Sequence, residues 1–365
     1  MQEIQTDFLI VGQGLAGSLL AWFLAERGQR VHIVDNDHEY SSSVVAAGII
    51  NPVTGRRLVK SWMIDELLPV AKSTYLEIEK KLSISIYQER VIYRALADVK
   101  AENVWDERSG DQGYEQYLGA EKPEDKIRNL MNPPFSWGAI HKAAQVDIPT
   151  FLETIEDYFT NKKQFSRTTF NYDDLKFLEN GDVFCKLSND ENQVENIIAK
   201  QVIFCEGQRA RFNPWFGNLP FVVSKGEMLE VKIEGGADLP IVKHKAYLAP
   251  LQDSKLWIGA TYEWNELDEE PTEKARTQLI KNLEKSITVP YEIVKQNAAI
   301  RPTVKDRRPF LGTHSKHATI HIFNGLGTKG TSLGPYWGQH FVDYLLQGKQ
   351  IDSAVDIKRF DGNGK

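Results

Sequence analysis

A short glycine-rich segment near the N-terminus has the spacing of a phosphate-binding loop. Gly12, Gly14 and Gly17 give the pattern GxGxxG. Gly12 allows a tight turn, Gly14 lets the backbone approach a pyrophosphate, and Gly17 lets a helix pack closely on a strand. Free N–H groups at the start of that helix would face the phosphates. The predicted chemistry is dinucleotide binding, and the loop alone does not separate FAD from NAD.

The elements around this loop are those that a dinucleotide fold requires. Residues 7–11 and 31–34 are apolar runs typical of buried strands, and residues 18–27 predict a helix between them. Such a β-α-β unit takes about 30 residues. Asp35 ends the second strand, where its carboxylate can accept hydrogen bonds from ribose hydroxyls and its charge opposes a 2′-phosphate. In this context the glycine pattern is a strong signal, and it argues against NADP.

A second glycine-rich loop occurs near the C-terminus. Residues 320–323 predict a strand, 325–330 a loop, and 334–346 a helix that Gly348 ends. A positive helix end at this loop can stabilise the negative charge of a reduced flavin near its N1–C2=O region. An NAD dehydrogenase needs no such loop, so the pattern favours FAD. The alternative is a packed strand-to-helix turn without a ligand.

The remaining segments indicate how the chain is organised. Helices are predicted over 62–82, 147–159 and 271–286, short antiparallel strands over 165–204, three further strands over 221–262, and irregular structure over 86–140. Rossmann-like pieces lie at both ends with antiparallel pieces between them. We therefore expect an α/β fold in which an antiparallel-sheet substrate domain is inserted into a discontinuous FAD-binding domain. The expected FAD-binding domain is 1–85 with 141–215 and 300–365, and the expected substrate domain is 86–140 with 216–299.

Composition limits the classes of partner. The chain has 365 residues, 41% of them hydrophobic, and a net charge of −6. This charge gives no general attraction to nucleic acid or anionic lipid. No signal peptide or membrane span is predicted, so a cytoplasmic location is expected. Cys185 and Cys205 lie in apolar runs and are predicted to be buried free thiols, and no cysteine–histidine cluster suggests a metal.

The chain resembles the D-amino-acid oxidase family of FAD-dependent oxidoreductases, nearest in pattern to glycine oxidase, sarcosine oxidase and the flavin domain of a bifunctional tRNA-modifying enzyme. The resemblance spans nearly the whole chain in five ordered pieces. They are the GxGxxG unit with Asp35, Ser41–Gly48, Val202–Gly207, Tyr247–Pro250 with Trp257–Thr261, and Ile300-Arg301-Pro302 continuing through 306–312 to the loop 325–335.

The resemblance implies an FAD that is bound non-covalently, since no cysteine follows Gly312. It also implies that Tyr247 faces the substrate and that Arg301 binds a substrate carboxylate, for which a guanidinium offers two parallel hydrogen bonds. An interdomain salt bridge is the alternative role of Arg301. The implied cofactor residues are Gly12, Gly14, Leu15, Ala16, Gly17, Asp35, Ser43, Ala47, Gly48, Val146, Gly207, Arg301, Gly327, Thr328, Lys329, Gly330 and Thr331.

The sequence also departs from its relatives. Thr328 stands where glycine oxidase has an arginine, with Lys329 beside it, and Trp257 stands where sarcosine-oxidase-like members have a lysine that aids reaction with oxygen. Alanine is common in the family where Cys205 and Glu206 stand here. Substrate identity and the electron acceptor, oxygen or another, therefore stay open.

The expected reaction is oxidation of an amine, such as a D-, N-alkyl- or secondary amino acid, to an imine, with hydride transfer to flavin N5. No catalytic residue is assigned, because the cofactor carries the chemistry. The expected partner is a small molecule bearing a carboxylate, not nucleic acid, and the oligomeric state is open. Two alternatives are an FAD-dependent enzyme acting on a modified tRNA nucleoside, which the acidic charge disfavours, and a flavin-holding subunit without its own catalysis.

Several further side chains have ordinary structural interpretations. His32 is expected in the core or at a sheet edge, while His244 precedes Tyr247 and is a weaker candidate for the pocket wall. Trp257 and Trp264 are expected in the core or in the pocket wall. The basic cluster formed by Arg56, Arg57 and Lys60 is expected on a solvated surface, although it has the charge to reach an anionic substrate.

Overall fold

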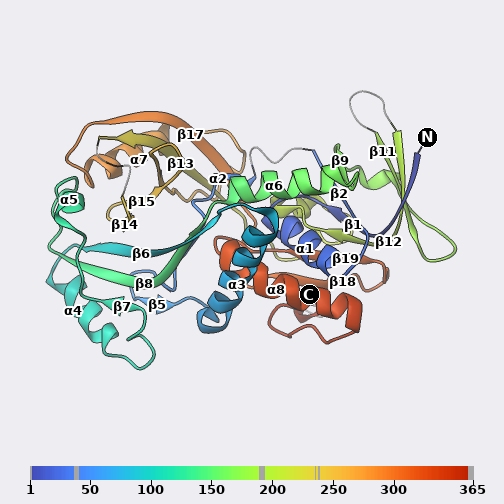
Figure 1. Ribbon diagram of the computed structural model, residues 1–365, viewed down its shortest axis with the longest axis horizontal. Coiled ribbons are helices and arrows are strands. Elements are labelled where there is room, and N and C mark those ends of the chain that lie inside the picture. Colours follow the sequence, from blue (N-terminus) through green and yellow to red (C-terminus); the bar gives the residue numbers. More distant parts are fainter. Residues whose placement is uncertain (1, 37–40, 189–193, 235, 237–238, 361–365) are drawn as a thin grey trace. The chain divides into compact units, whose positions relative to one another are not determined.

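The computed structural model describes residues 2–36, 41–188, 194–234, 236 and 239–360 (Figure 1). The chain forms two compact units, and each is made of segments that are distant in sequence. The first unit contains Met1–Val44, Ile148–Ser224 and Ile300–Lys365, and the second contains Val45–Asp147 and Lys225–Ala299.

The first unit is built on a sheet whose central strands are parallel. They are ordered β9, β2, β1, β12 and β19. Their bounds are Phe165–Arg167, Val31–Asp35, Gln2–Val11, Val194–Phe204 and Ile320–Asn324. The apolar runs in β1 and β2 do not alternate with polar residues because such a sheet is covered on both faces. The predicted strand–helix–strand start of the chain is confirmed.

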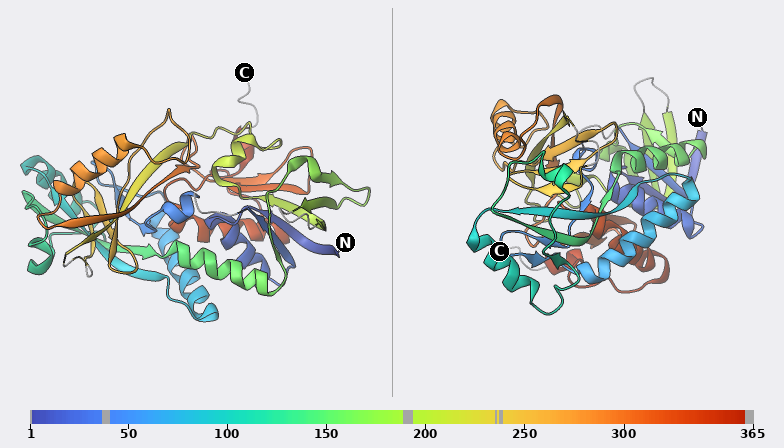
Figure 2. Two further views of the ribbon diagram at one scale, coloured as in Figure 1. Left: turned by 90° about the horizontal axis from the view of Figure 1, so that it is seen from above. Right: turned by 60° about the vertical axis from the view of Figure 1, so that its left-hand side comes forward.

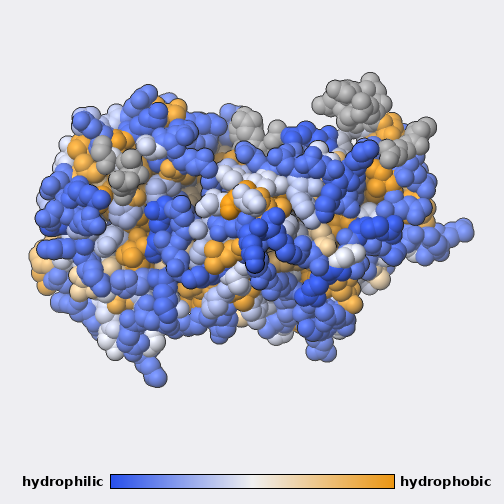
Figure 3. Space-filling model, viewed as in Figure 1, coloured by the Kyte–Doolittle hydropathy of each residue, from blue (hydrophilic) through white to orange (hydrophobic). Residues whose placement is uncertain are grey.

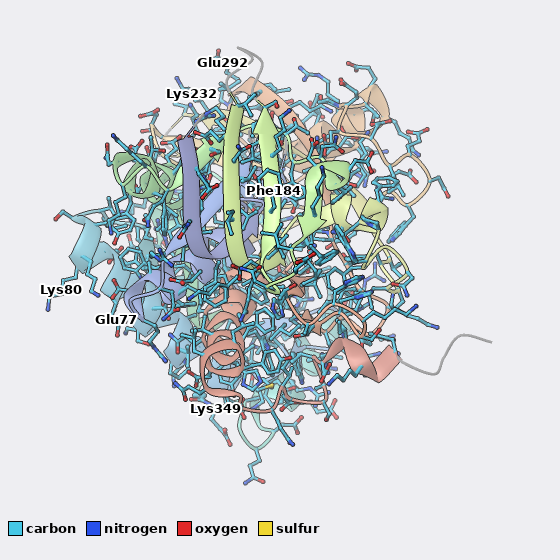
Figure 4. All side chains as sticks on the ribbon, turned by 90° about the vertical axis from the view of Figure 1, so that its right-hand side faces the viewer. Glu77, Lys80, Phe184, Lys232, Glu292 and Lys349 are labelled. Carbon is cyan, nitrogen blue, oxygen red and sulfur yellow. The ribbon has the colours of Figure 1, made fainter. Side chains whose placement is uncertain are left out.

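An antiparallel extension continues this sheet. Strands β10 (Leu175–Phe177) and β11 (Val183–Ser188) pair antiparallel beside the first half of β12, and Figure 4 labels Phe184 on β11. Strand β18 (Phe310–Thr313) pairs antiparallel with β19. The prediction of short antiparallel strands over 165–204 is wrong for β9, which pairs parallel with β2, and for β12 where it pairs parallel with β1. A helix precedes β9, so the chain crosses over before entering the sheet and can run parallel.

The first unit contains the helices α1 (Leu15–Glu26), α6 (Ile148–Asn161) and α8 (Gly330–Gln347). Helices α1 and α8 lie side by side in Figures 1 and 2. A Cβ added at Gly330, Gly334 or Gly338 would lie 3.0, 2.6 or 2.9 Å from a side chain of α1. Helix α8 begins at Gly330 and not at Gly334 as predicted. The three glycines lie within the helix and form the surface that packs against α1.

The second unit is built on a mixed, mainly antiparallel sheet. Its strands are ordered β17, β13, β16, β15, β14, β6, β8 and β3, and β6 runs parallel to β14. Their bounds are Tyr291–Arg301, Ser224–Ile233, Lys255–Gly259, Tyr247–Pro250, Ile241–Lys243, Tyr87–Leu96, Ser136–Val146 and Ile49–Ile50. Helix α7 (Glu273–Glu284) packs Leu279 and Leu283 on the core of this sheet. The span 221–262 thus holds four strands instead of the three predicted.

The prediction of irregular structure over 86–140 is wrong. This span contains β6, the start of β8, α4 (Val99–Ser109), β7 (Leu118–Gly119) and α5 (Asp125–Arg128). Strand β6 was hard to recognise because charged residues interrupt its pattern and its register shifts between Arg90 and Ile92. The predicted helix over 62–82 is confirmed as α3 (Ile64–Leu82), which follows the hairpin of β4 (Val53–Thr54) and β5 (Val59–Lys60).

The two compact units divide the chain at different places from the expected domains. Residues 45–85 and 141–147, assigned from the sequence to an FAD-binding domain, belong to the second unit. The short helix α2 (Ser42–Val45) spans the change from one unit to the other. Ile49 pairs with Gln145, so β3 and the end of β8 fall in the same unit.

The face seen in Figure 3 is largely hydrophilic, with scattered hydrophobic residues. Among the helices that the structure describes, none has the length and apolar character needed to cross a membrane. Cys185 and Cys205 are buried free thiols, as predicted.

A partly buried acid lies two residues after the end of β12. The carboxylate of Glu206 accepts hydrogen bonds from Tyr172 Oη at 2.6 Å and from Asn213 Nδ2 at 2.8 Å. Burial nevertheless raises the pKa of Glu206 to about 7, because these two donors compensate only part of the lost hydration. The folded protein thus binds a proton at Glu206 more tightly than an unfolded chain does.

Glu206 should make the protein less stable as the pH rises. Its pKa is about 4.5 when unfolded and about 7 when folded, so stability falls between these two pH values and then levels off. Glu206→Gln should remove this slope and raise the free energy of unfolding at pH 8 by about 1–3 kcal/mol. Urea unfolding at pH 5 and pH 8 measures the effect. An equal change at both pH values would show that Glu206 stays ionised in the fold.

Candidate functional site

Backbone crowding fixes the turn between β1 and α1. Gly12 has φ +99°, and a Cβ there would lie 2.7 Å from the carbonyl oxygen of Cys205. A Cβ on Gly17 would lie 1.9 Å from the carbonyl oxygen of Gly12. Backbone atoms cannot move aside as a flexible side chain can, so both positions require glycine. The two predicted roles, a tight turn and close helix packing, are confirmed.

Gly14 differs because its neighbourhood is open. It is the N-cap of α1, and a Cβ there would approach only the Oγ of Ser43, at 3.2 Å. The same hydroxyl accepts a hydrogen bond from Leu15 N at 3.1 Å. Gly14 has no side chain that could cap the first N–H groups of α1. Space beside Gly14 at a helix N-terminus suits a phosphate group, as predicted from the sequence.

Asp35 lies close to this turn. Its Oδ2 accepts a hydrogen bond from Gln13 N at 2.6 Å, so the end of β2 is tied to the glycine loop. Gln13 is itself buried, and its Nε2 donates to the carbonyl oxygen of Leu152 on α6. The first unit therefore brings Gly12, Gly14, Gly17, Asp35 and Ser43 together. Leu15 and Ala16 form the first turn of α1 and are buried.

The second glycine loop starts α8 next to the start of α1. Gly325 and Gly327 have φ of +75° and +58°, which a side chain would disfavour. Gly330 is the first residue of α8, and a Cβ there would lie 3.0 Å from Leu15 Cδ2. The N-termini of α1 and α8 are therefore neighbours. Two positive helix ends at one place favour an anionic ligand.

Cationic side chains add to this field. Lys329 is the N-cap of α8, and burial together with the charges of Arg307 and Arg308 lowers its pKa. Thr328 and Thr331 lie on either side of this turn, and Thr331 is buried. The sequence singled out Lys329 but gave no role to Arg307 and Arg308. Both arginines stand beside a predicted turn. Arginines in such positions are common on protein surfaces, so the sequence alone did not identify these two.

Two further predicted residues belong to the first unit. Gly207 follows β12 with φ +55°, and its carbonyl oxygen accepts a hydrogen bond from Asn324 Nδ2 at 3.0 Å. Arg301 is the last residue of β17 and is partly buried. Its carbonyl oxygen accepts a hydrogen bond from Thr303 N at 2.9 Å.

The remaining predicted residues belong to the second unit. A Cβ on Gly48 would lie 1.9 Å from the carbonyl oxygen of Val146, and Val146 N donates to the carbonyl oxygen of Gly48 at 3.0 Å. The carbonyl oxygen of Ala47 accepts a hydrogen bond from Gln145 Nε2 at 3.0 Å. Ala47, Gly48 and Val146 thus form one tightly packed backbone cluster.

Tyr247 lies elsewhere in the second unit, on β15. Its hydroxyl accepts a hydrogen bond from Asn51 Nδ2 at 3.1 Å, and burial raises its pKa. Arg94 and Lys243 lie near the ring, with Lys243 Nζ 4.5 Å from its centroid. Sequence reasoning missed Asn51, Arg94 and Lys243. A cation at the end of a short apolar strand is a signal that could have identified Lys243.

Other side chains have structural roles. Trp257 is buried, and its Nε1 donates to the carbonyl oxygen of Val45 at 2.9 Å. Trp264 is 59% exposed and stacks with Tyr262, so its expected place in the core or pocket wall is not found. His32 is buried against Ser166, which confirms the core interpretation.

His244 and the basic cluster after Gly55 have ordinary structural environments. The Nε2 of His244 is 3.1 Å from the carbonyl oxygen of Asn132, and its ring packs edge-on against Trp137. Arg56 and Arg57 are exposed, as expected. No group of three or more metal-binding side chains occurs among the residues that the structure describes.

Comparison with known proteins shows which family the chain resembles. The sequence profile of the family described as "FAD dependent oxidoreductase" (DAO) matches residues 7–344. A segment of 149 residues is 28% identical to glycine oxidase of Bacillus subtilis strain 168, so the chain spans 37% of the length of that relative and the match covers 37% of this chain.

Two solved structures share the fold. Glycine oxidase from Geobacillus kaustophilus aligns with a TM-score of 0.76 at 20% identity, covering 96% of this chain and 97% of that one. Glycine oxidase from Bacillus cereus ATCC 14579 aligns with a TM-score of 0.78 at 21% identity, covering 95% and 96%. Because the family profile covers nearly the whole chain, from β1 into α8, the chain belongs to the DAO family of FAD-dependent oxidoreductases.

Proposed function

We propose that this enzyme oxidises an amino acid or a related secondary amine that carries a carboxylate. The observation that carries the proposal is the pair of neighbouring helix N-termini at Gly14 and Gly330, which suits an anionic dinucleotide. The FAD, when bound, would accept a hydride from the carbon that bears nitrogen. The relatives named glycine oxidase support an amino acid as the substrate class.

The residues of the first unit fit the cofactor. Gly14 and the N–H groups at the start of α1 would bind its pyrophosphate, and Asp35 would accept hydrogen bonds from ribose hydroxyls. The start of α8, with Thr328 and Lys329, would place positive charge near the ring. We expect non-covalent binding. The roles of Leu15, Ala16, Ser43, Ala47, Gly48, Val146, Gly207, Arg301, Gly327, Gly330 and Thr331 as cofactor residues stay predictions.

Two residues are proposed to bind the substrate. Arg301 would hold its carboxylate through two parallel hydrogen bonds, a geometry that lysine cannot reproduce. Tyr247 would contact it through the hydroxyl that Asn51 orients. Burial raises the pKa of Tyr247, so this hydroxyl stays protonated at neutral pH and can donate a hydrogen bond.

The direct test is an anaerobic screen in which a substrate bleaches the flavin absorbance. The panel holds D-amino acids, N-alkyl glycines, cyclic amino acids, simple amines and an aminomethyl-uridine nucleoside. We expect bleaching by one amino-acid class. Bleaching by the nucleoside alone would indicate an enzyme for modified tRNA. A flavin that no compound bleaches would indicate a flavin-holding subunit.

Gly14→Val should abolish FAD binding while leaving the protein folded. Its φ of −67° is allowed for valine, and the new Cβ would meet only Ser43 Oγ within the protein. It would, however, occupy the space proposed for the pyrophosphate. Absorbance at 450 nm and thermal unfolding of the purified variant measure the two effects.

Gly17→Ala provides the contrast. Its Cβ would collide with the carbonyl oxygen of Gly12, so this variant should lose stability, which Gly14→Val should keep. Stoichiometric FAD in Gly14→Val would show that the phosphates bind elsewhere.

Arg301→Lys should weaken the binding of carboxylate inhibitors by about 1–3 kcal/mol, the scale of a charge-assisted hydrogen bond. FAD content should stay the same, since lysine keeps the positive charge. Titrations followed by flavin absorbance measure the affinity. If every carboxylate binds the variant and the parent equally, Arg301 has a structural role.

A further inference from the structure

The sheet of the second unit has an apolar face and a face that carries polar side chains. Val242, Leu248 and Ile258 belong to the apolar core with residues of α7. Successive residues of a strand point to opposite faces. Lys243 and Tyr247, which neighbour these core residues in sequence, therefore lie on the other face.

Arg94, Lys243 and Tyr247 form one row across three adjacent strands. Lys243 of β14 is in register with Arg94 of β6 and with Tyr247 of β15. Residues in register point to the same side, and neighbouring strands lie about 4.8 Å apart. Two cations therefore stand next to each other beside the tyrosine proposed to contact the substrate.

Neither cation forms an ion pair within the part of the chain that the structure describes. Arg94 Nη1 donates to the carbonyl oxygen of Gly55 at 2.8 Å, and Lys243 Nζ lies over the Tyr247 ring. The edge of the Arg94 guanidinium formed by Nε and Nη2 has no protein acceptor among these residues. This edge is the one that binds a carboxylate through two parallel hydrogen bonds.

The arrangement is electrostatically unfavourable without an anion. Both cations are partly buried. Burial and the charge of Arg94 lower the pKa of Lys243 to about 8. The backbone turn at Gly55, which Arg94 contacts, is followed by the exposed Arg56 and Arg57.

We propose that Arg94 and Lys243 bind a second carboxylate of the substrate, separate from the amino-acid carboxylate. The inference rests on the proposed function in which Tyr247 contacts the substrate. It narrows the substrate class to amino acids whose nitrogen substituent or side chain ends in a carboxylate. Such a group would complete the guanidinium edge of Arg94 and neutralise the charge that destabilises protonated Lys243.

The test uses matched ligands that lack an amine and so cannot be oxidised. The FAD-loaded enzyme is titrated by calorimetry with succinate and propionate, glutarate and butyrate, and adipate and pentanoate. Each pair differs by one carboxylate. We expect at least one dicarboxylate to bind tenfold or more tightly than its partner. Arg94→Gln and Lys243→Gln should each remove most of this advantage and leave the affinity of the monocarboxylate unchanged.

Lys245→Gln is the matched control, because it removes the same charge from an exposed lysine two residues from Lys243. It should keep the dicarboxylate advantage. Thermal unfolding verifies that the variants fold. If loss of the Gly55 hydrogen bond prevents Arg94→Gln from folding, Lys243→Gln still decides the question.

The outcomes separate this inference from the proposed function. Equal affinity within every pair, no binding of any dicarboxylate, or an advantage that persists in the glutamine variants overturns the inference. Dicarboxylate binding that depends on Arg94 and Lys243, with no amino acid bleaching the flavin, supports this anion site but contradicts the proposed reaction. Flavin bleaching by monocarboxylic amino acids, together with equal affinity for the two ligands of every pair, supports the proposed reaction but contradicts this anion site.

Discussion

The close approach of α1 to its backbone neighbours determines how the first unit is arranged. Gly17 lies so near the carbonyl oxygen of Gly12 that a Cβ would stand 1.9 Å away, and a Cβ on Gly330 of α8 would stand 3.0 Å from the side chain of Leu15. These contacts hold the start of α1 against its own turn and bring the start of α8 against α1. Their N-termini therefore lie next to each other, and each provides about half a positive charge from its aligned peptide dipoles. An anionic cofactor is the chemical consequence of this packing.

Local charge matters more here than the net charge of −6. Lys329 lies at the start of α8 within the field of Arg307 and Arg308, and its pKa is lowered by burial and by those two charges. In the second unit, Lys243 experiences burial and the charge of Arg94 in the same way. Both lysine pKa values are lowered first by burial and then by neighbouring cations, so holding these charges costs stability, and anionic groups offset that cost.

The sequence predicted what depends on local pattern. The glycine loop with Asp35, the helix α3 and the family resemblance follow from short-range spacing, and the structure and the comparisons confirm them. Strand β6 was missed because charged residues and a register shift near Arg90 hide its alternation. The pairing of Arg94 with Lys243 joins strands that are far apart in sequence, so no local pattern contains it. The start of α8 was misplaced because its glycines were interpreted as a loop, whereas their function is to pack against α1.

We infer that the β1–α1 turn and Asp35 hold the ADP half of FAD. Competition binding to the flavin-free protein measures whether they do. FAD should bind one molecule per chain and should be displaced by ADP, whereas FMN, which lacks the adenosine half, should bind at least a hundredfold more weakly and should not compete. Equal binding of FMN and FAD, or an FAD complex that ADP does not displace, would show that the ADP half binds elsewhere.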